Sequence, residues 1–286
     1  MPYDDGAPLP PELADAIERA RPRLGRLGAP LLFFRTIGST NDVALTRSAS
    51  AHSAGLSSLD GPGDRADVGA RSEGLVVVAD QQTAGRGRRG HTWFSPPGSG
   101  LYVSVVLAPA TARVDPARAT MLLTLAAGVA LAEGIEAATG LRVDLKWPND
   151  LQVSRRKVAG ILAEAAGTVV VGYGINVAAT AFPPELRDRA TSLESELGRV
   201  VARHHVLVET LGALSSRYED LLAGRFDAIL DAWRVRAPDA SGARVAWMTA
   251  AGERSGVTAG IDDRGALLVH DGERVERIVS GEITWL

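Results

Sequence analysis

The chain has 286 residues, of which 45% are hydrophobic and 23% charged, the balance of an ordinary soluble protein with a sizeable core. Its 31 basic and 34 acidic residues give a net charge of −3, which argues against bulk electrostatic binding to nucleic acid. The absence of cysteine excludes disulfides, zinc–cysteine sites and thiol catalysis.

The N-terminal region carries no targeting signal that we recognise. No apolar run reaches membrane-spanning length, and the acidic, proline-containing start lacks the basic and apolar parts of a signal peptide. We therefore expect a cytoplasmic protein without a membrane partner. Pro10 to Gly28 predicts one amphipathic helix, which is too short for a helix-turn-helix with its supporting helices, so we expect no DNA-binding domain here.

The next segments alternate between strands, a helix start and a polar stretch. A strand is predicted at 31–36, and Ser39 resembles the N-cap of a following helix. Residues 48–72 hold Gly, Ser, Ala and Asp with almost no large apolar side chains, which predicts a mobile insertion. A buried strand at 73–80 leads into a loop rich in glycine and arginine, and a strand at 101–107 leaves it.

Asp115 and Pro116 have the composition of a helix start, and they open a long apolar helix that ends at Gly140. After Pro238 the pattern changes to five short β-prone runs separated by glycines, which predicts a small barrel. We therefore expect an α+β protein with a mixed body at 1–237 and a β domain at 238–286. Within the body, strands are expected at 142–146, 151–153, 158–165 and 168–177, and helices at 201–223 and 226–236.

The loop Gly85-Arg-Gly-Arg-Arg-Gly90 is the strongest chemical signal. Glycine lets the backbone approach a ligand closely, and arginine offers a charged planar fork that fits carboxylate or phosphate. The loop matches G-x-G-x-x-G, but a Pro-Pro-Gly turn and a strand follow it instead of the helix that a dinucleotide site requires. A surface loop with chance arginines is the ordinary alternative. We expect the loop to close over an anion, with Trp93 offering an aromatic face.

Four other motifs are weak when taken singly. Lys146-Trp-Pro-Asn-Asp150 reads as a turn, and the lysine of Arg156-Lys157 could be a solvated residue at a strand edge. Gly160 falls within a predicted strand, where a missing side chain marks close approach of a ligand or backbone. Gly172-Tyr-Gly-Ile-Asn176 ends a strand, and Ser39-Thr-Asn-Asp42 could be only an N-cap.

Taken together and in this order, the motifs resemble those of biotin protein ligases, over nearly the whole chain after the first 30 residues. Residues 260–268 and 281–283 extend the resemblance into the C-terminal region. It implies a mixed-sheet catalytic domain, like that of class II aminoacyl-tRNA synthetases and biotin ligases, followed by an SH3-like barrel. Some members carry an N-terminal winged helix that binds DNA. This chain resembles the form that lacks it, so we expect no nucleic-acid partner.

The resemblance implies a two-step reaction with ATP and biotin as substrates and Mg²⁺ on the phosphates. Biotin's carboxylate attacks ATP to give biotinyl-5′-AMP, and a lysine on the biotin carboxyl carrier domain of an acyl-CoA or pyruvate carboxylase then takes the biotin. No metal ligands are assigned. The implied catalytic residues are Lys157, Arg88, Arg86 and Asp150; the implied biotin-binding residues are Ser39, Thr40, Asn41, Gln82, Gly85, Arg86, Arg88, Lys157 and Gly160; the implied ATP-binding residues are Arg86, Arg88, Arg89, Trp93, Lys146, Asn149 and Asn176.

Two alternatives stay open. A lipoate or octanoate ligase would share the fold, although the arginine triplet favours biotin. A non-catalytic regulator that binds biotin or nucleotide is the other, and the presence of Lys157 beside the full arginine loop argues against it. The five histidines form no metal-ligand pattern, so we expect neither zinc nor a catalytic histidine.

Overall fold

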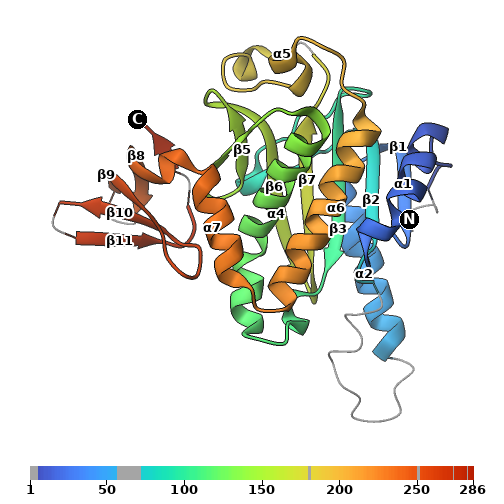
Figure 1. Cartoon of the computed structure of the whole chain (residues 1–286), viewed down its shortest axis with the longest axis horizontal. Coiled ribbons are helices and arrows are strands. Elements are labelled where there is room, and N and C mark those ends of the chain that lie inside the picture. Colours follow the sequence, from blue (N-terminus) through green and yellow to red (C-terminus); the bar gives the residue numbers. More distant parts are fainter. Residues whose placement is uncertain (1–5, 57–71, 180–181, 250–251, 273, 282) are drawn as a thin grey trace.

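Helices cover both faces of a seven-stranded sheet, and a five-stranded sheet follows at the C-terminal end of the chain (Figure 1). The computed structural model describes residues 6–56, 72–179, 182–249, 252–272, 274–281 and 283–286. The fold class is therefore α+β, as expected, with a mixed sheet and a separate antiparallel sheet.

The large sheet has the strand order β1-β2-β3-β7-β6-β5-β4. β1 and β2 are parallel, and every other neighbouring pair is antiparallel. This order brings β3, β7 and β6 to the centre, so residues from three separate stretches of sequence face the same side. The strands are β1 Leu31–Ile37, β2 Val76–Gln82, β3 Gly100–Leu107, β4 Asp144–Lys146, β5 Asp150–Val153, β6 Arg156–Ala166 and β7 Thr168–Asn176.

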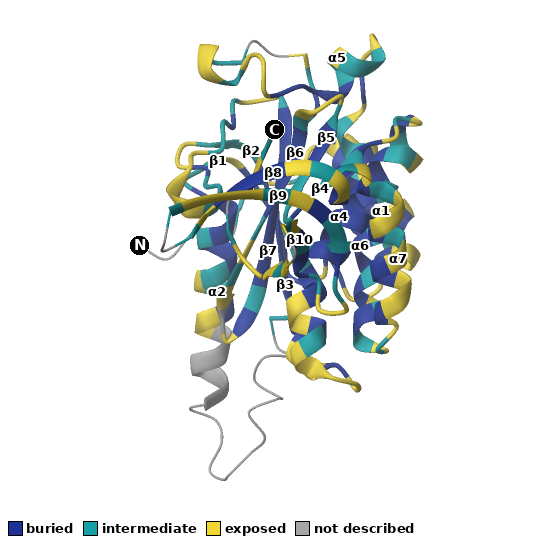
Figure 2. Ribbon diagram, turned by 90° about the vertical axis from the view of Figure 1, so that its left-hand side faces the viewer, coloured by how far each residue is buried: buried dark blue, intermediate teal, exposed yellow. Residues whose placement is uncertain are grey.

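One face of the sheet carries most of the helices. α4 lies against the sheet and packs closely on α6 and α7, and α1 packs on α6 (Figure 1). Buried residues are concentrated in the strands and on the inner sides of these helices (Figure 2). The helices are α1 Pro11–Leu24, α2 Thr40–Leu56, α4 Pro116–Thr139, α5 Leu193–Leu197, α6 Arg203–Leu222 and α7 Phe226–Arg236.

The opposite face carries α2. Val43 and Ala44 of this helix are fully buried against Val77, Tyr102 and Val170 of the central strands, in a core separate from that of the α4 face. Since α2 begins at Thr40, its first turn lies over the middle of the sheet and leaves the neighbouring surface of β6 and β7 open.

The second sheet has the order β11-β10-β9-β8-β12 and is antiparallel throughout. It is attached to the body by specific contacts: the Trp147 indole donates to the Gly265 carbonyl at 2.9 Å, and Arg118 donates to the Asp263 carbonyl at 2.8 Å. These contacts place the small sheet beside β4 and β5. Its strands are β8 Ser241–Thr249, β9 Gly252–Ile261, β10 Leu267–Asp271, β11 Arg274–Ile278 and β12 Ile283–Trp285.

Two expectations need correction, and one helix was not expected. α4 is long and apolar enough to cross a membrane, contrary to the expectation from sequence, but 67% of its apolar window is buried within the protein, where it forms the core. α2 continues to Leu56, beyond position 48 where the insertion was expected to begin, and residues 57–71 lie outside the described part. The short helix α5, which Ser192 caps, was not predicted because it has only five residues.

Candidate active site

A cavity of about 450 Å³, a volume that includes adjoining open solvent, lies on the α2 face between the first turn of α2, the loop after β2 and the strands β6 and β7. It gathers residues from all five motifs that the sequence analysis singled out. The lining residues are Ser39, Thr40, Asn41, Gln82, Arg86, Gly87, Arg88, Trp93, Asn149, Lys157, Gly160, Ile161, Leu162, Gly172, Tyr173 and Gly174.

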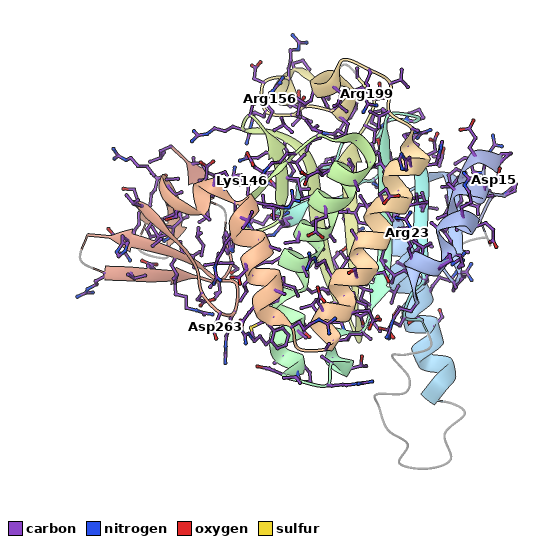
Figure 3. All side chains as sticks on the ribbon, in the orientation of Figure 1. Asp15, Arg23, Lys146, Arg156, Arg199 and Asp263 are labelled. Atoms are coloured by element: carbon purple, nitrogen blue, oxygen red, sulfur yellow. The ribbon has the colours of Figure 1, made fainter. Side chains whose placement is uncertain are left out.

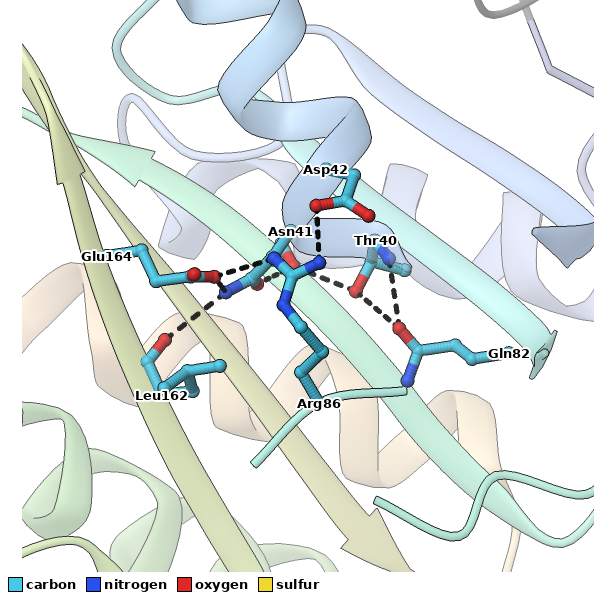
Figure 4. Close-up of polar contacts among 8 residues, drawn as sticks. Thr40, Asn41, Asp42, Gln82, Arg86, Leu162 and Glu164 are labelled. Carbon is cyan, nitrogen blue, oxygen red and sulfur yellow. Dashed lines mark hydrogen bonds and ion pairs between the residues drawn. The ribbon is translucent and has the colours of Figure 1, made fainter. Parts of the chain in front are cut away.

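The inner end of the cavity is a polar network at the start of α2 (Figure 4). The Gln82 amide oxygen accepts from both the backbone N–H and the hydroxyl of Thr40, at 2.9 and 3.1 Å. Ser104 of β3 bonds to Thr40 at 2.8 Å and to the Asn41 amide oxygen at 2.5 Å. Ser39, Thr40 and Asn41 are nearly fully buried, so their polar groups are held in defined positions at this end of the cavity.

Glycines of β6 and β7 form the floor of the cavity. Gly160 of β6 and Gly174 of β7 are paired in register, and a Cβ at Gly174 would overlap the Trp93 indole. A Cβ at Gly160 would lie 2.9 Å from Cε of Lys157 and 3.0 Å from Trp93, and one at Gly172 would overlap the Asn41 amide. These glycines let the indole and the amide approach the sheet, as a mid-strand glycine often does.

The arginine loop folds back on itself. Trp93 donates its backbone N–H to the Gly85 carbonyl at 2.9 Å, and Gly87 donates to His91 at 2.6 Å, so residues 85–93 form a short hairpin. Arg89 lies at its tip with φ of 54°, in the left-handed region. The side chain of Arg88 points back to the cavity and donates to the Asn149 amide oxygen at 3.1 Å.

Arg86 lines the cavity and pairs with two carboxylates that the sequence analysis did not assign to it. Its guanidinium bridges two carboxylates, Asp42 Oδ1 at 2.5 Å and Glu164 Oε2 at 3.0 Å (Figure 4). Burial alone would lower the pKa of Arg86, but the hydrogen bonds and charges of the two carboxylates outweigh it and raise that pKa. Arg86 therefore stays charged, and its charge is shared between two acidic partners.

Lys157 lies at the mouth of the cavity. Its Nζ is 2.6 Å from Asp150 Oδ1 and 5.2 Å from the centroid of the Trp93 ring. The Trp93 indole N–H is buried and has no hydrogen-bond acceptor among the described residues. The mouth thus combines a cation, a carboxylate, an aromatic ring and an unused donor.

Three of the expected nucleotide-binding residues, Arg89, Lys146 and Asn176, do not line this cavity. Lys146 lies where the body meets the small sheet (Figure 3), with its Nζ 5.8 Å from the centroid of the Trp285 ring. Burial lowers the pKa of Lys146. Asn176 donates to the Thr191 carbonyl at 3.0 Å, which braces the segment next to Lys157, and it lines a smaller neighbouring cavity with Phe94 and Ala178.

Sequence reasoning missed three residues of the network, which are Asp42, Ser104 and Glu164. Asp42 was part of a recognised motif but was read as belonging to a helix start. Ser104 and Glu164 lie within strands, where alternation alone predicts only which face they occupy. A half-buried arginine is stabilised by a nearby carboxylate. This is the signal from which acidic partners of the loop arginines could have been predicted.

The described residues hold no group of three or more His, Asp or Glu side chains that could bind a metal ion. His91, which lies within the loop, is exposed. The site therefore offers hydrogen bonds and fixed charges as its chemical groups.

Comparisons with known proteins agree with this arrangement. Residues 66–178 match the Biotin/lipoate A/B protein ligase family, and residues 241–284 match the Biotin protein ligase C terminal domain. The chain is 33% identical to the biotin--[acetyl-CoA-carboxylase] ligase of Mycobacterium tuberculosis over 238 residues, which are 78% of this chain and 83% of that protein. The corresponding ligase of Paracoccus denitrificans is 34% identical over 202 residues, 68% of this chain and 82% of the relative.

Bifunctional ligase/repressor BirA of Bacillus spizizenii is 39% identical over 219 residues, 74% of this chain, but the match spans 66% of the relative, just under two thirds of its length. Among solved structures, the biotin protein ligase of Aquifex aeolicus in complex with biotin and ATP superposes with a TM-score of 0.71 at 28% identity. That superposition covers 90% of this chain and 98% of the Aquifex chain.

Proposed function

The chain belongs to the biotin/lipoate A/B protein ligase family, and on this premise we propose that it is an ATP-dependent biotin protein ligase. It joins biotin to AMP with release of pyrophosphate, and then transfers biotin to a lysine of a biotin carboxyl carrier domain. The observation that carries the proposal is a single cavity with a buried polar end and a basic, aromatic mouth. The names of the relatives support a carboxylase as the source of the carrier domain.

The buried end of the cavity fits the ureido ring of biotin. A cyclic urea offers one carbonyl acceptor and two N–H donors, and the hydroxyls and amides of Ser39, Thr40, Asn41 and Gln82 supply both kinds of partner. Trp93 lies against the floor at Gly160 and Gly174, so the apolar part of the vitamin would pack beside its indole. Biotin's carboxylate would then point toward Arg88 and Lys157.

The first step brings together two anions. The carboxylate oxygen attacks the α-phosphorus, and the bond to the pyrophosphate oxygen breaks. No base is needed because the carboxylate is already ionised near neutral pH. Arg88 and Lys157 offset the repulsion, and their charges act more strongly in a shielded site than in water. Trp93 and Asn149 lie beside them, where they would contact the nucleotide.

In the second step the carrier lysine attacks the carbonyl of the mixed anhydride, forming an amide while AMP leaves and the amine loses a proton. We assign Asp150 to receive the incoming amine, because its carboxylate lies beside Lys157 at the mouth. The loop hairpin covers the cavity and keeps water from the reactive anhydride.

We propose that Mg²⁺ enters with ATP rather than in a protein site. Magnesium is commonly held by substrate phosphates, waters and one or two carboxylates, and the described residues present no larger acidic cluster. When bound, it would neutralise phosphate charge. Lys146 and Asn176 stay proposed nucleotide contacts, and Arg89 at the hairpin tip joins them.

We also propose a division at residue 237, with a catalytic domain before it and an SH3-like domain after it, which the separate family matches support. A cytoplasmic location suits the substrates. We assign no nucleic-acid partner, because the net charge is −3 and Arg88 of the basic loop points into the site.

The test is incubation of the protein with radiolabelled biotin, ATP and a lysine-bearing carrier domain. Covalent label on the carrier and biotin-dependent pyrophosphate release are expected. Absence of both with an active carrier would refute the proposal. Replacing biotin by lipoate separates this function from its nearest rival: biotin should raise the melting temperature and lipoate should not, because only biotin carries the ureido group.

A further inference from the structure

We propose that Asp42 and Glu164 are positioning residues that hold Arg86, and that Arg86 acts by fixing the arginine loop over the cavity rather than by neutralising the reacting anions. The inference rests on the proposed function, since it assigns a role within that reaction. It reassigns the first arginine of the loop from ligand contact to loop anchor.

The geometry of the ion pairs supports an anchor. Arg86 leaves the loop between two rigid elements, with Asp42 in the first turn of α2 and Glu164 in β6. The same Glu164 oxygen that accepts from Arg86 also accepts from the Asn41 amide at 2.6 Å (Figure 4). Asn41 is in turn held by Ser104 of β3. The loop is thereby joined to the helix that carries the buried polar end and to two strands of the sheet.

The position of Arg86 in the hairpin gives the anchor its effect. Arg86 forms a bridge with Thr92 at the base of the hairpin, next to the bond between Trp93 and Gly85. Fixing this base restricts the orientation of the hairpin beyond it, including Arg88, and of the adjoining Trp93 ring. Ordering a loop costs about 1–2 kcal/mol per residue in backbone entropy, so part of that cost is met before ligand binds.

Charge counting favours an anchor over an anion ligand. Two carboxylates and one guanidinium give the cluster a formal charge of −1, which does not attract an anion. The side chains of Arg86, Asp42 and Glu164 are 35%, 38% and 31% exposed, so water screens the cluster but does not separate it. An arginine whose fork is occupied on both sides has no spare bidentate face for a phosphate or carboxylate.

The two roles predict opposite effects of one substitution. Glu164→Gln removes a negative charge beside Arg86 while its amide oxygen can still accept from Asn41. If Arg86 binds the anions, losing a nearby negative charge should leave substrate binding unchanged or strengthen it. If Arg86 is an anchor, the loop loosens, and we expect the KM for biotin to rise about tenfold and biotinyl-AMP to dissociate faster.

A double-mutant cycle tests whether the residues act as one unit. Arg86→Gln and Arg86→Gln/Glu164→Gln should have the same KM for biotin within about twofold, because the anchor is already lost in the single variant. Additive effects would overturn the proposal. Asp42→Asn provides a second, independent loss of the anchor and should resemble Glu164→Gln.

Limited trypsin digestion tests the anchor without any enzymatic activity. Cleavage between Arg88 and Arg89, followed by mass spectrometry on the ligand-free full chain, should be about tenfold faster in Asp42→Asn and Glu164→Gln than in the unchanged protein. The matched control is Asp231→Asn, which breaks a similar ion pair with Arg234 on the far side of the molecule and should cleave like the unchanged protein.

The outcomes separate the two proposals. Unchanged cleavage in both variants, or biotin binding that is equal or tighter in Glu164→Gln, overturns the anchor. If the unchanged protein releases no pyrophosphate with biotin and ATP, the proposed function fails, and the digestion result still decides whether Arg86 anchors the loop. A circular dichroism melt of each variant checks that the loss is local.

Discussion

The ammonium group of Lys157 lies 2.6 Å from a carboxylate oxygen of Asp150, across the hairpin formed by β5 and β6. Both residues were singled out from the sequence, but seven positions separate them, and the antiparallel pairing of β5 with β6 brings them together. Because Lys157 also lies beside Trp93, its charge is directed at the mouth of the cavity.

Replacing Lys157 by Met should therefore remove a charge on which the first step depends. We expect biotin-dependent pyrophosphate release to fall by about a hundredfold or more, as when a preorganised charge is lost from an active site. Arg156→Gln is the matched control, because Arg156 is the cation next to Lys157 in sequence but pairs with Glu196 outside the cavity. Equal losses in the two variants would show that general basicity at this strand end, and not the position of Lys157, is what matters.

Arg88→Ala should release the adenylate as well as slow its formation. Arg88 joins the hairpin to Asn149, so its loss removes both a charge and a contact that closes the loop. We expect hydroxylamine-trappable biotin to appear in solution at several times the rate seen with the unchanged protein. Retention of the intermediate at the original level would contradict this role.

Gly174→Ala should disturb the site without unfolding the protein. The added Cβ overlaps the Trp93 indole, which must move away from the sheet. We expect the KM for ATP to rise at least about fivefold, while the melting temperature changes little because the indole is only half-buried. Gly212→Ala in α6 is the control: its nearest neighbour is 3.9 Å away, and it should leave catalysis unchanged. An unaltered KM for ATP in Gly174→Ala would argue against a nucleotide role for Trp93.

Gly134→Ala should instead lower stability. Gly134 of α4 faces α6 so closely that a Cβ would lie 2.5 Å from Cα of Thr210. The backbone of Thr210 cannot move away without shifting α6. We therefore expect a loss of about 1–3 kcal/mol in the free energy of unfolding, measured by urea denaturation. Gly212→Ala, with open space, should be neutral or stabilising by up to about 1 kcal/mol. The same sign in both variants would contradict the close packing of the two helices.

Stability should depend on pH through Glu209. The hydrogen bond from Arg23 lowers the pKa of Glu209 below its ordinary value of 4.5. A group whose pKa is lower in the folded state adds stability above its unfolded pKa and loses it as pH falls through the folded value. Glu209→Gln should therefore be less stable at pH 7 by about 0.5–1 kcal/mol, a small figure because Arg23 is mostly exposed.

This difference should shrink as the pH is lowered from about 5 toward 2. Thermal melts of the two proteins at each pH provide the comparison. A difference that grows in acid would show that the Arg23–Glu209 pair does not lower the pKa.

The sequence by itself determined the fold class, most of the strands and helices, and the family. These depend on local information: the glycine and arginine spacing of 85–90, the Lys146–Asp150 turn and the alternation of apolar residues are all readable along the chain. The resemblance then grouped residues 39–41, 82–88, 157 and 160, and the cavity brings these groups together.

Only the tertiary structure decided which partners the side chains have. Arg86 meets Glu164 because β6 lies two places from β3 in the sheet and α2 crosses that face, and no spacing along the chain records this order. The same order places Asn176 against the Thr191 segment and Lys146 near Trp285, outside the lining of the cavity. Long-range strand order and register fix these contacts. The sequence therefore shows which side chains suit the site chemically, but not which partners they contact in the folded protein.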